Sequence, residues 1–325
     1  MCMKISRELL CQIESDLGLN VPFIKGQDIN IKNVWHFYSD GSSVDMMFGT
    51  EDDLRHGINR IFTLSLNCKC VILAFALMDT HFHFVLYGEF EECNRFIHEY
   101  LRQTSQYLTT EYGERHKLRG VDTSHQSVGT LSYLRTVICY TVKNPPTGGL
   151  PYLAHTYPWS SGPLYFAGSN TSWASTRWTS LIAGCPRLSQ MTLKEQNVII
   201  HNRSKIEYDA RVIDGIVFPG DYVAYEIVEK IFKTCRCFNY FMCKSKESDV
   251  DALGGTISHL SMPMREMRQY KNETCMELFG HASAKMLDTR QRILLARTLR
   301  ARYYSSDRQI IRLCGLVYDE VKDLL

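Results

Sequence analysis

The length, composition and charge of the chain set broad limits on its fold and function. Its 325 residues are 45% hydrophobic, enough for a substantial core but long for one compact unit, so we expect two domains or one domain with a large extension. Lys and Arg number 37 against 35 Asp and Glu, so the overall charge does not mark a nucleic-acid-binding protein, and any DNA-binding prediction depends on local features.

The start of the chain and its cysteines both indicate a protein that is not exported. Residues 1–20 mix charged side chains into their apolar positions, which predicts neither a signal peptide nor a membrane anchor. The twelve cysteines form no repeated C-x-x-C pairs, as is typical of reduced thiols. We therefore expect a soluble, cytoplasmic protein.

The first half of the chain predicts alternating strands and helices. A strand-like run over 34–38 precedes an amphipathic helix over 51–66, in which apolar residues recur at three- and four-residue spacing. Two strands joined by a tight connection follow over 70–78 and 81–87. A long helix is then expected over 91–112.

The next segments complete a predicted α+β domain. One more strand within 120–128 is followed by a helix over 131–142, which ends before Asn144 and the prolines at 145 and 146, because proline disfavours helical conformation in the preceding residue. This element order is that of a ferredoxin-like antiparallel sheet with helices on one side. We place that domain at 31–166, after an N-terminal extension over 1–30.

The rest of the chain, 177–325, predicts a mainly helical region, and the polar stretch at 167–176 is taken as the boundary. The apolar, cysteine-rich run over 235–243 is interpreted as core. A break at Gly315 between short helices suits a helix-turn-helix over 287–325. The expected helices of this region are 220–233, 287–303, 307–313 and 317–325.

Two histidines on a predicted strand are candidate metal ligands. His81 and His83 are one residue apart, so their imidazoles leave the same face of the strand and can reach one divalent ion, whereas Phe82 points into the core. Two structural histidines would show the same spacing. The pair alone does not decide between these interpretations.

Tyr140 and Asn144 are spaced i and i+4 near the end of a predicted helix, which places a phenol and an amide on one face about one turn apart. Cleavage of a phosphodiester by tyrosine needs a metal to polarise the phosphate, a positioned hydroxyl, and deprotonation of a phenol whose pKa is ordinarily ~10. Taken alone, Tyr140 is more often a half-buried helix aromatic than a nucleophile. Together with His81 and His83, the two residues form a sufficient set for this reaction.

Three ordered motifs point to a family. The runs are LMDTHFHFVL at 77–86, YTVKNPPTGGL at 140–150 and YPWSS at 157–161. In order and spacing they resemble the REP-associated tyrosine transposases, a branch of the single-tyrosine HUH transposases. The resemblance covers roughly 34–161. It departs from the family at Thr80, where Asn is frequent, and at Pro146, where a branched aliphatic residue is frequent.

The resemblance implies an HUH endonuclease fold and a role for each matched residue. Tyr140 would be the catalytic nucleophile, and His81, His83 and Asn144 would bind a divalent metal, Mg²⁺ or Mn²⁺. The family cleaves single-stranded DNA beside a hairpin through a 5′-phosphotyrosine intermediate. The resemblance further implies a bacterial protein that is nucleoid-associated when bound to DNA. It leaves open a homodimer in which the partner subunit supplies the tyrosine.

Basic residues near these motifs and near the end of the chain are candidate DNA contacts. Residues 285–312 contain eight Lys or Arg against two Asp, an excess that suits phosphate binding but is equally common on a solvated helix face. The candidate DNA-binding residues are Arg135, Lys143, Arg297, Arg300, Arg308 and Arg312.

Two other functions fit parts of the pattern. One is a catalytically silent DNA-binding protein, such as a domesticated transposase or a repressor. The other is a metalloenzyme acting on a small molecule, which needs a further strong ligand that the sequence does not clearly place. Because all four candidate residues are present, catalysis is favoured, and we expect them to converge on an exposed face of a four- or five-stranded antiparallel sheet.

Overall fold

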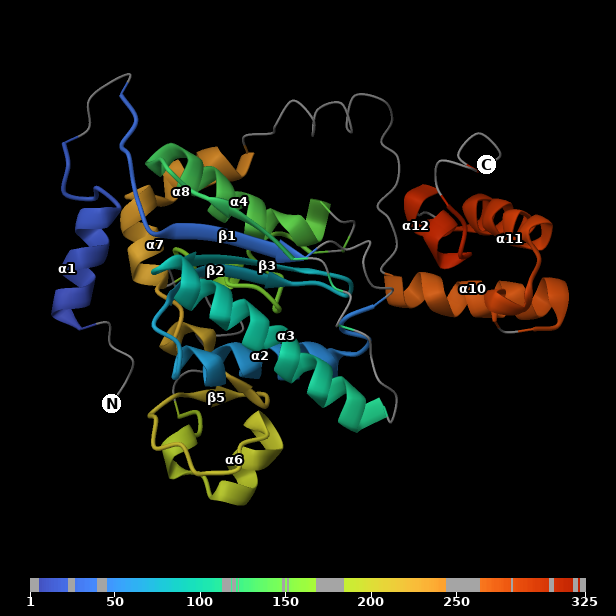
Figure 1. Cartoon of the computed structure of the whole chain (residues 1–325), viewed down its shortest axis with the longest axis horizontal. Coiled ribbons are helices and arrows are strands. Elements are labelled where there is room, and N and C mark those ends of the chain that lie inside the picture. Colours follow the sequence, from blue (N-terminus) through green and yellow to red (C-terminus); the bar gives the residue numbers. More distant parts are fainter. Residues whose placement is uncertain are drawn as a thin grey trace. The chain divides into compact units, whose positions relative to one another are not determined.

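A four-stranded antiparallel sheet organises the first half of the chain (Figure 1). The strands lie in the spatial order β2-β3-β1-β4, and every neighbouring pair is antiparallel. This confirms the prediction of an α+β fold built on an antiparallel sheet. The strands are β1 (Val34–Ser39), β2 (Val71–Leu77), β3 (Phe82–Tyr87) and β4 (Thr123–Ser127).

Contacts divide the computed structural model into two units, Met1–Asn144 with Leu153–Lys244, and Pro145–Tyr152 with Ser245–Leu325. The boundary predicted from the sequence, 167–176, lies mostly outside the described residues. Those described are 6–22, 27–39, 46–112, 118, 121, 123–147, 150, 152–167, 184–243, 264–281, 283–303, 307–317 and 321. No helix among them is long and apolar enough to cross a membrane.

The register of the sheet separates two chemically different faces. Phe37 lies opposite Phe84, and Tyr38 lies opposite His83. Because successive side chains of a strand alternate between faces, the phenylalanines of β1 and β3 gather on one face and the histidines of these two strands on the other. The apolar face includes Phe37, Phe82 and Phe84, and the polar face includes His36, Tyr38 and His83.

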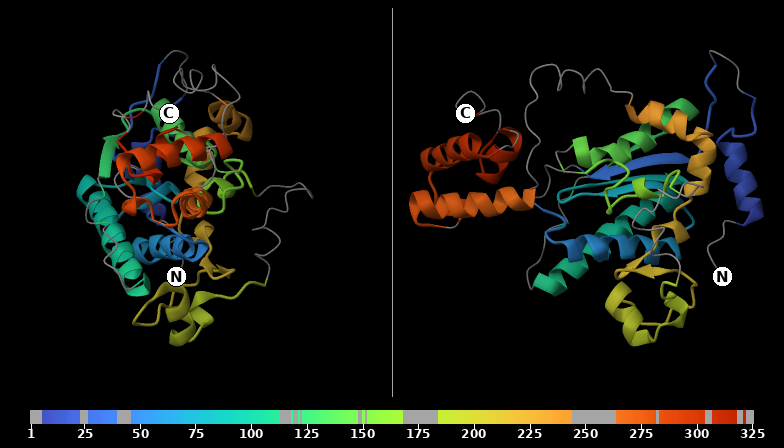
Figure 2. Two further views of the ribbon diagram at one scale, coloured as in Figure 1. Left: turned by 90° about the vertical axis from the view of Figure 1, so that its right-hand side faces the viewer. Right: turned by 180° about the vertical axis from the view of Figure 1, so that it is seen from behind.

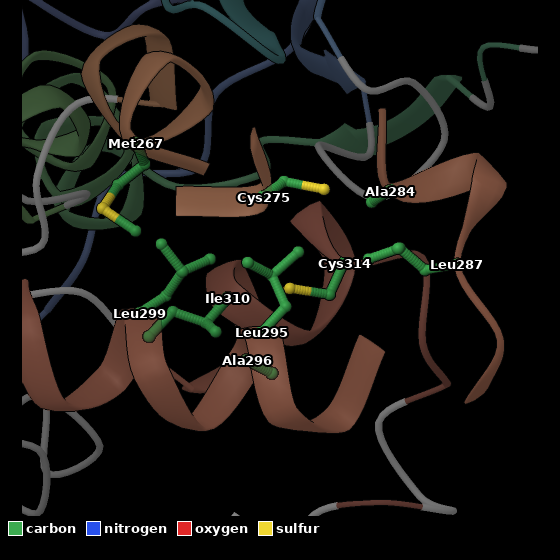
Figure 3. Packing of buried hydrophobic residues seen from close by; sticks show 9 residues of the cluster. All are labelled: Met267, Cys275, Ala284, Leu287, Leu295, Ala296, Leu299, Ile310 and Cys314. Carbon is green, nitrogen blue, oxygen red and sulfur yellow. The ribbon is translucent and has the colours of Figure 1, made fainter. Parts of the chain in front are cut away.

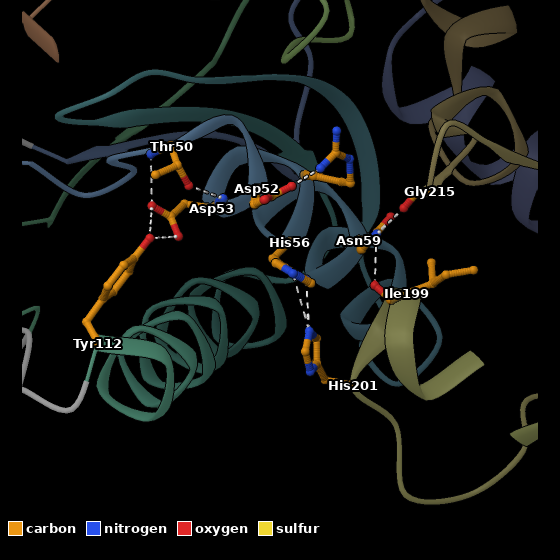
Figure 4. A network of polar contacts seen from close by, with 10 residues as sticks. Thr50, Asp52, Asp53, His56, Asn59, Tyr112, Ile199, His201 and Gly215 are labelled. Carbon is orange, nitrogen blue, oxygen red and sulfur yellow. Dashed lines mark hydrogen bonds and ion pairs between the residues drawn. The ribbon is translucent and has the colours of Figure 1, made fainter. Parts of the chain in front are cut away.

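Two helices, α2 (Glu51–Ser65) and α3 (Phe90–Tyr112), cover the apolar face. The ring of Phe84 lies 5.2 Å from that of Tyr100 on α3, in an edge-to-face contact typical of packed aromatic cores. Helix α2 begins at a capping box, in which the side chains of Thr50 and Asp53 accept each other's backbone N–H (Figure 4). Both elements were predicted from their apolar spacing.

Helix α4 (Leu131–Thr147) lies on the opposite side of the sheet from α2 and α3, as the views of Figures 1 and 2 agree. The expectation of helices on one side only is therefore wrong for this domain. The physical reason is that α4 has an apolar stripe, with Leu134, Val137 and Ile138 buried, and such a stripe must be covered.

The end of α4 also differs from the prediction. The helix continues through Pro145 and Pro146 instead of ending before Asn144. Proline's fixed φ suits a helix, and the hydrogen bonds lost to its missing N–H fall only in the last turn, where the chain is leaving the helix. Leu150 then donates its N–H to the Pro145 carbonyl at 3.0 Å.

The free edge of β2 is covered by the segment that follows α4. The Leu77 N–H donates to the Trp159 carbonyl at 2.9 Å, and the Ser161 N–H donates to the Phe75 carbonyl at 3.0 Å. The Tyr157 hydroxyl donates to the Leu77 carbonyl at 2.7 Å. The third sequence motif therefore closes a sheet edge that would otherwise be open to pairing with other chains.

The described part of 184–243 packs with the first half of the chain. The hairpin β5–β6 turns at Asp214 and Gly215, both at positive φ, as a two-residue hairpin loop requires. The expected helix over 220–233 begins only at Tyr225. In the run over 235–243 only Phe238 is buried, so the interpretation of this run as core is wrong. The elements are η3 (Leu188–Gln190), α6 (Leu193–Ile200), β5 (Val212–Ile213), β6 (Ile216–Val217), η4 (Pro219–Asp221), α7 (Tyr225–Phe232) and α8 (Cys235–Cys243).

The second unit has a hydrophobic core of its own, drawn in Figure 3. The predicted helices over 287–303 and 307–313 correspond to α11 and α12, and Gly315 at φ +67° follows α12. The expected helix over 317–325 lies almost wholly outside the described residues. The elements here are α10 (Met264–Phe279), η5 (Ala284–Met286), α11 (Thr289–Arg302) and α12 (Asp307–Leu313), and the first unit also has α1 (Arg7–Asp16) and η2 (Gly162–Leu164).

Candidate active site

Strand β3 and the residue before it carry the two predicted histidines. His83 lies within the strand, opposite Tyr38 of β1 and Ala76 of β2, and His81 immediately precedes the strand. Their ring centroids are 5.3 Å apart. The spacing of one residue therefore places both imidazoles on the same side of the sheet, as the sequence predicts.

Helix α4 brings the other two predicted residues to the histidines. The Asn144 Oδ1 lies 3.1 Å from Nε2 of His81, and the Tyr140 ring lies 5.4 Å from that of His83, nearly perpendicular to it. Both contacts arise because residues i and i+4 share one helix face. The four predicted residues thus lie together in the structure.

The surroundings of the site are more enclosed than the sequence analysis expects. His83 is only 3% exposed, because α4 covers the sheet face that carries it, whereas Tyr140 is 41% exposed at the rim. Burial lowers the pKa of His83 well below its ordinary value, and the neighbouring His81 and His36 lower it further. The His83 imidazole is therefore neutral near pH 7, which is the form that binds metals.

The hydroxyl of Thr80 lies next to the first histidine. Its Oγ1 is 3.0 Å from Nδ1 of His81, while Nε2 of the same ring faces Asn144. A hydrogen bond at one ring nitrogen fixes which nitrogen is directed at a ligand. The hydroxyl of Thr80 is therefore placed where it can orient the His81 ring.

A metal ion would find two imidazole nitrogens and one amide oxygen here. No group of three or more His, Cys, Asp or Glu able to hold an ion occurs in the described part of the chain. However, adjacent ligands of an octahedral ion at ~2.1 Å are about 3 Å apart, close to the 3.1 Å between His81 Nε2 and Asn144 Oδ1. This donor set fits an ion whose other positions belong to water and phosphate oxygen.

His36 is a neighbour of the site that the sequence analysis does not identify. Its Nε2 lies 3.1 Å from Nδ1 of His83, and its ring is 6.0 Å from that of Tyr140. The alternation of strand residues puts His36 and Tyr38 on one face, but which face depends on the register of β1 against β3. Only this long-range pairing brings His36 to His83.

The basic residues singled out in the sequence have different surroundings. Arg135 donates from Nε and Nη2 to the Ile231 carbonyl at 2.9 and 2.8 Å, so it connects α4 to α7. Lys143 is partly buried next to Asn144 on α4, and Arg297 and Arg300 are exposed on α11. Arg312 is partly buried on α12, and the Arg308 side chain lies outside the described structure.

Comparisons with known proteins add little to this geometry. Neither a protein-family model nor a curated protein matches the chain. Among solved structures, the chain is similar to a REP-associated tyrosine transposase bound to a REP hairpin, with a TM-score of 0.33 and 16% identity, over 45% of this chain and 86% of that chain. A likeness of this size does not show that the two chains share a fold.

Proposed function

We propose that this protein is a metal-dependent endonuclease and strand transferase for single-stranded DNA, of the single-tyrosine HUH type, with Tyr140 as nucleophile. The observation that carries the proposal is the convergence on one sheet face of His81, His83, Tyr140 and Asn144. The ferredoxin-like strand order β2-β3-β1-β4 and the three motifs support it.

The reaction follows from what these side chains can do. The Tyr140 oxygen forms a bond to phosphorus, the bond from phosphorus to the 3′ oxygen breaks, and a 5′-phosphotyrosine and a 3′-hydroxyl remain. The phenolic proton passes to water at the exposed rim and one proton is taken up by the 3′ oxygen. Attack of a 3′-hydroxyl on the phosphotyrosine rejoins the strand and restores the phenol.

The other residues of the site would bind a metal ion or add positive charge near it. His81, His83 and Asn144 would bind Mg²⁺ or Mn²⁺, which when bound polarises the scissile phosphate. Lys143 adds a positive charge one residue before Asn144 on α4. Because α4 and β3 of one chain bring Tyr140 to within 5.4 Å of His83 between ring centroids, the geometry supports cleavage by the chain's own tyrosine without a partner subunit.

The basic helices of the second unit would supply additional DNA contacts. Helix α11 carries five arginines and no acidic residue. The side chains proposed to contact phosphates are Arg297, Arg300, Arg308 and Arg312.

The test is a denaturing gel of the full-length protein incubated with Mn²⁺ or Mg²⁺ and labelled single-stranded hairpin oligonucleotides. We expect a slowly migrating protein–DNA adduct that requires the metal and disappears in Tyr140→Phe. Tyr133→Phe is the matched control, since Tyr133 lies on the same helix with its hydroxyl bonded to Gln126 at 2.7 Å. An adduct that persists in Tyr140→Phe would overturn the proposal. DNA binding without cleavage in every variant would also overturn it, and would favour a catalytically silent DNA-binding protein.

A further inference from the structure

A third histidine lies directly behind the proposed site. His36 Nε2 is 3.1 Å from His83 Nδ1, and the two rings are stacked with centroids 5.3 Å apart and planes 16° apart. Both side chains are buried, with exposed fractions of 5% and 3%. Bulk water is therefore excluded from this contact, and a separation of this length between two buried imidazole nitrogens is that of a hydrogen bond.

Only one of the two rings can be the donor in this bond. A neutral imidazole carries one N–H and one lone pair, so the bond exists in two forms. If His83 donates from Nδ1, its Nε2 keeps a lone pair that can bind a ligand. If His36 donates from Nε2, the proton of His83 is on Nε2, and that atom cannot bind a metal.

Neighbouring aromatic rings restrict rotation of the His83 side chain. The Tyr38 ring is 5.9 Å from the His83 ring at 24°, and 5.1 Å from the His36 ring on its own strand. The Tyr140 ring also lies near His83, at 5.4 Å between ring centroids. Because His83 is buried among these rings, a rotation that exchanges its two ring nitrogens is hindered by packing.

We infer that His36 is a positioning residue whose Nε2 accepts a hydrogen bond from Nδ1–H of His83, so that His83 presents the lone pair of Nε2 to its ligand. This inference rests on the proposed function, because it assigns the metal-facing atom of a residue in that site. It resembles the way in which carboxylates and backbone carbonyls behind metal-binding histidines fix their tautomer. His36 and His83 then both carry their proton on Nδ1.

The tautomers can be measured without any DNA or metal. Full-length protein labelled with ¹⁵N-histidine gives two-bond ¹H–¹⁵N correlations that distinguish Nδ1–H from Nε2–H rings, and His36→Gln and His83→Gln identify the signals. We expect the Nδ1–H form for both rings. An Nε2–H form of His83 overturns the inference, whether or not the protein cleaves DNA.

Metal affinity is a second measurement, and a purely structural role of His36 would leave it unchanged. His36→Leu keeps the bulk but removes the acceptor, whereas His36→Gln can return an acceptor oxygen near the position of Nε2. We expect Mn²⁺ binding, measured by calorimetry, to weaken about 10- to 100-fold in His36→Leu and to recover largely in His36→Gln. Unchanged binding in His36→Leu, or an equal loss in both variants, contradicts the inference.

The two proposals can fail separately. If the wild-type protein forms no tyrosine adduct but shows the expected tautomers, the proposed function fails and the positioning role of His36 stands. If the Tyr140 adduct forms and His83 carries its proton on Nε2, the positioning role fails and the function stands. Should His36→Leu not fold, the tautomer measurement on the wild-type protein still decides.

Discussion

At the scale of single residues, the contact between Asn144 and His81 is the most informative feature of the site. It joins a side chain of α4 to the residue just before β3 across 3.1 Å, and amide oxygens and imidazole nitrogens are both groups that can bind metal ions. If the proposed metal binds, an amide and an imidazole at this separation would be preorganised for it. Asn144 also follows Tyr140 by one helical turn, so the positions of both side chains depend on α4.

Replacing Asn144 tests this arrangement. We expect Asn144→Ala to weaken Mn²⁺ binding by at least about tenfold, as losses of metal-supporting groups do, and Asn144→Asp to retain binding because a carboxylate is also an oxygen ligand. Calorimetric titration of the full-length protein with Mn²⁺ measures both. Asn197→Ala is the control, since the side chain of Asn197 on α6 donates to the Asn202 carbonyl. Equal Mn²⁺ affinities in Asn144→Ala and in this control contradict the assignment.

At the scale of elements, a buried asparagine connects α2 to the later hairpin and to the end of α6. Asn59 donates to the Ile199 and Gly215 carbonyls at 2.9 and 2.8 Å (Figure 4). It also accepts the Val217 N–H at 2.8 Å. One side chain thus satisfies three backbone groups far away in the sequence. It is one of the contacts that attach 193–217 to α2, together with that of His56 with His201.

Removing this side chain is expected to destabilise the first unit. Asn59→Leu leaves one buried and two partly buried backbone groups without this partner, so we expect the free energy of unfolding to fall by about 3 kcal/mol. Urea denaturation followed by circular dichroism measures the change. Asn67→Ala, which removes an exposed bond to the Thr63 carbonyl, serves as control and is expected to change stability by less than about 0.5 kcal/mol. Similar losses in the two variants would count against this role.

A pair of histidines makes the contact between α2 and α6 sensitive to pH. His201 Nε2 lies 3.0 Å from His56 Nδ1, as Figure 4 shows. Burial, followed by the nearby His201 and Arg60, lowers the pKa of His56 from 6.5 to about 4. The unfolded chain therefore binds more protons than the folded chain between these values, and the contribution to stability, full above pH 6.5, is lost as the pH falls toward 4.

This dependence predicts that the thermal midpoint of a variant without His56 changes less with pH. We expect the thermal midpoint of the protein to decrease as the pH is lowered from 7 to 4, and His56→Gln to reduce that decrease. Differential scanning calorimetry across the range measures it. His98→Gln removes an exposed histidine of α3 and should leave the profile as it is; a His56→Gln profile identical to that of wild type would refute the prediction.

At the scale of the whole molecule, the second unit folds around its own buried residues, as Figure 3 shows, and exposes arginines of α11. If Arg297 and Arg300 contact phosphates, each releases about one counterion on binding. We expect each substitution to Gln to reduce the slope of log affinity against log salt by about 1, measured by fluorescence anisotropy with hairpin DNA.

A neighbouring arginine provides the control for this measurement. Arg302 donates to both carboxylate oxygens of Glu277 at 2.6 and 3.0 Å. Its charge is already balanced, so Arg302→Gln should leave the salt slope nearly unchanged. A salt slope unchanged in Arg297→Gln as well as in Arg302→Gln would mean that Arg297 does not contact phosphates, and equal reductions in both would contradict the use of Arg302 as a control.

The sequence by itself determined the strands, most helices and the four candidate site residues, because these depend on local spacing: one residue along a strand for His81 and His83, four along a helix for Tyr140 and Asn144. Only the tertiary structure decided which sheet face α4 covers, that His36 reaches His83, and that Arg135 bonds the Ile231 carbonyl. These features depend on strand register and on the covering of apolar surfaces by segments distant in the chain, which no local pattern specifies.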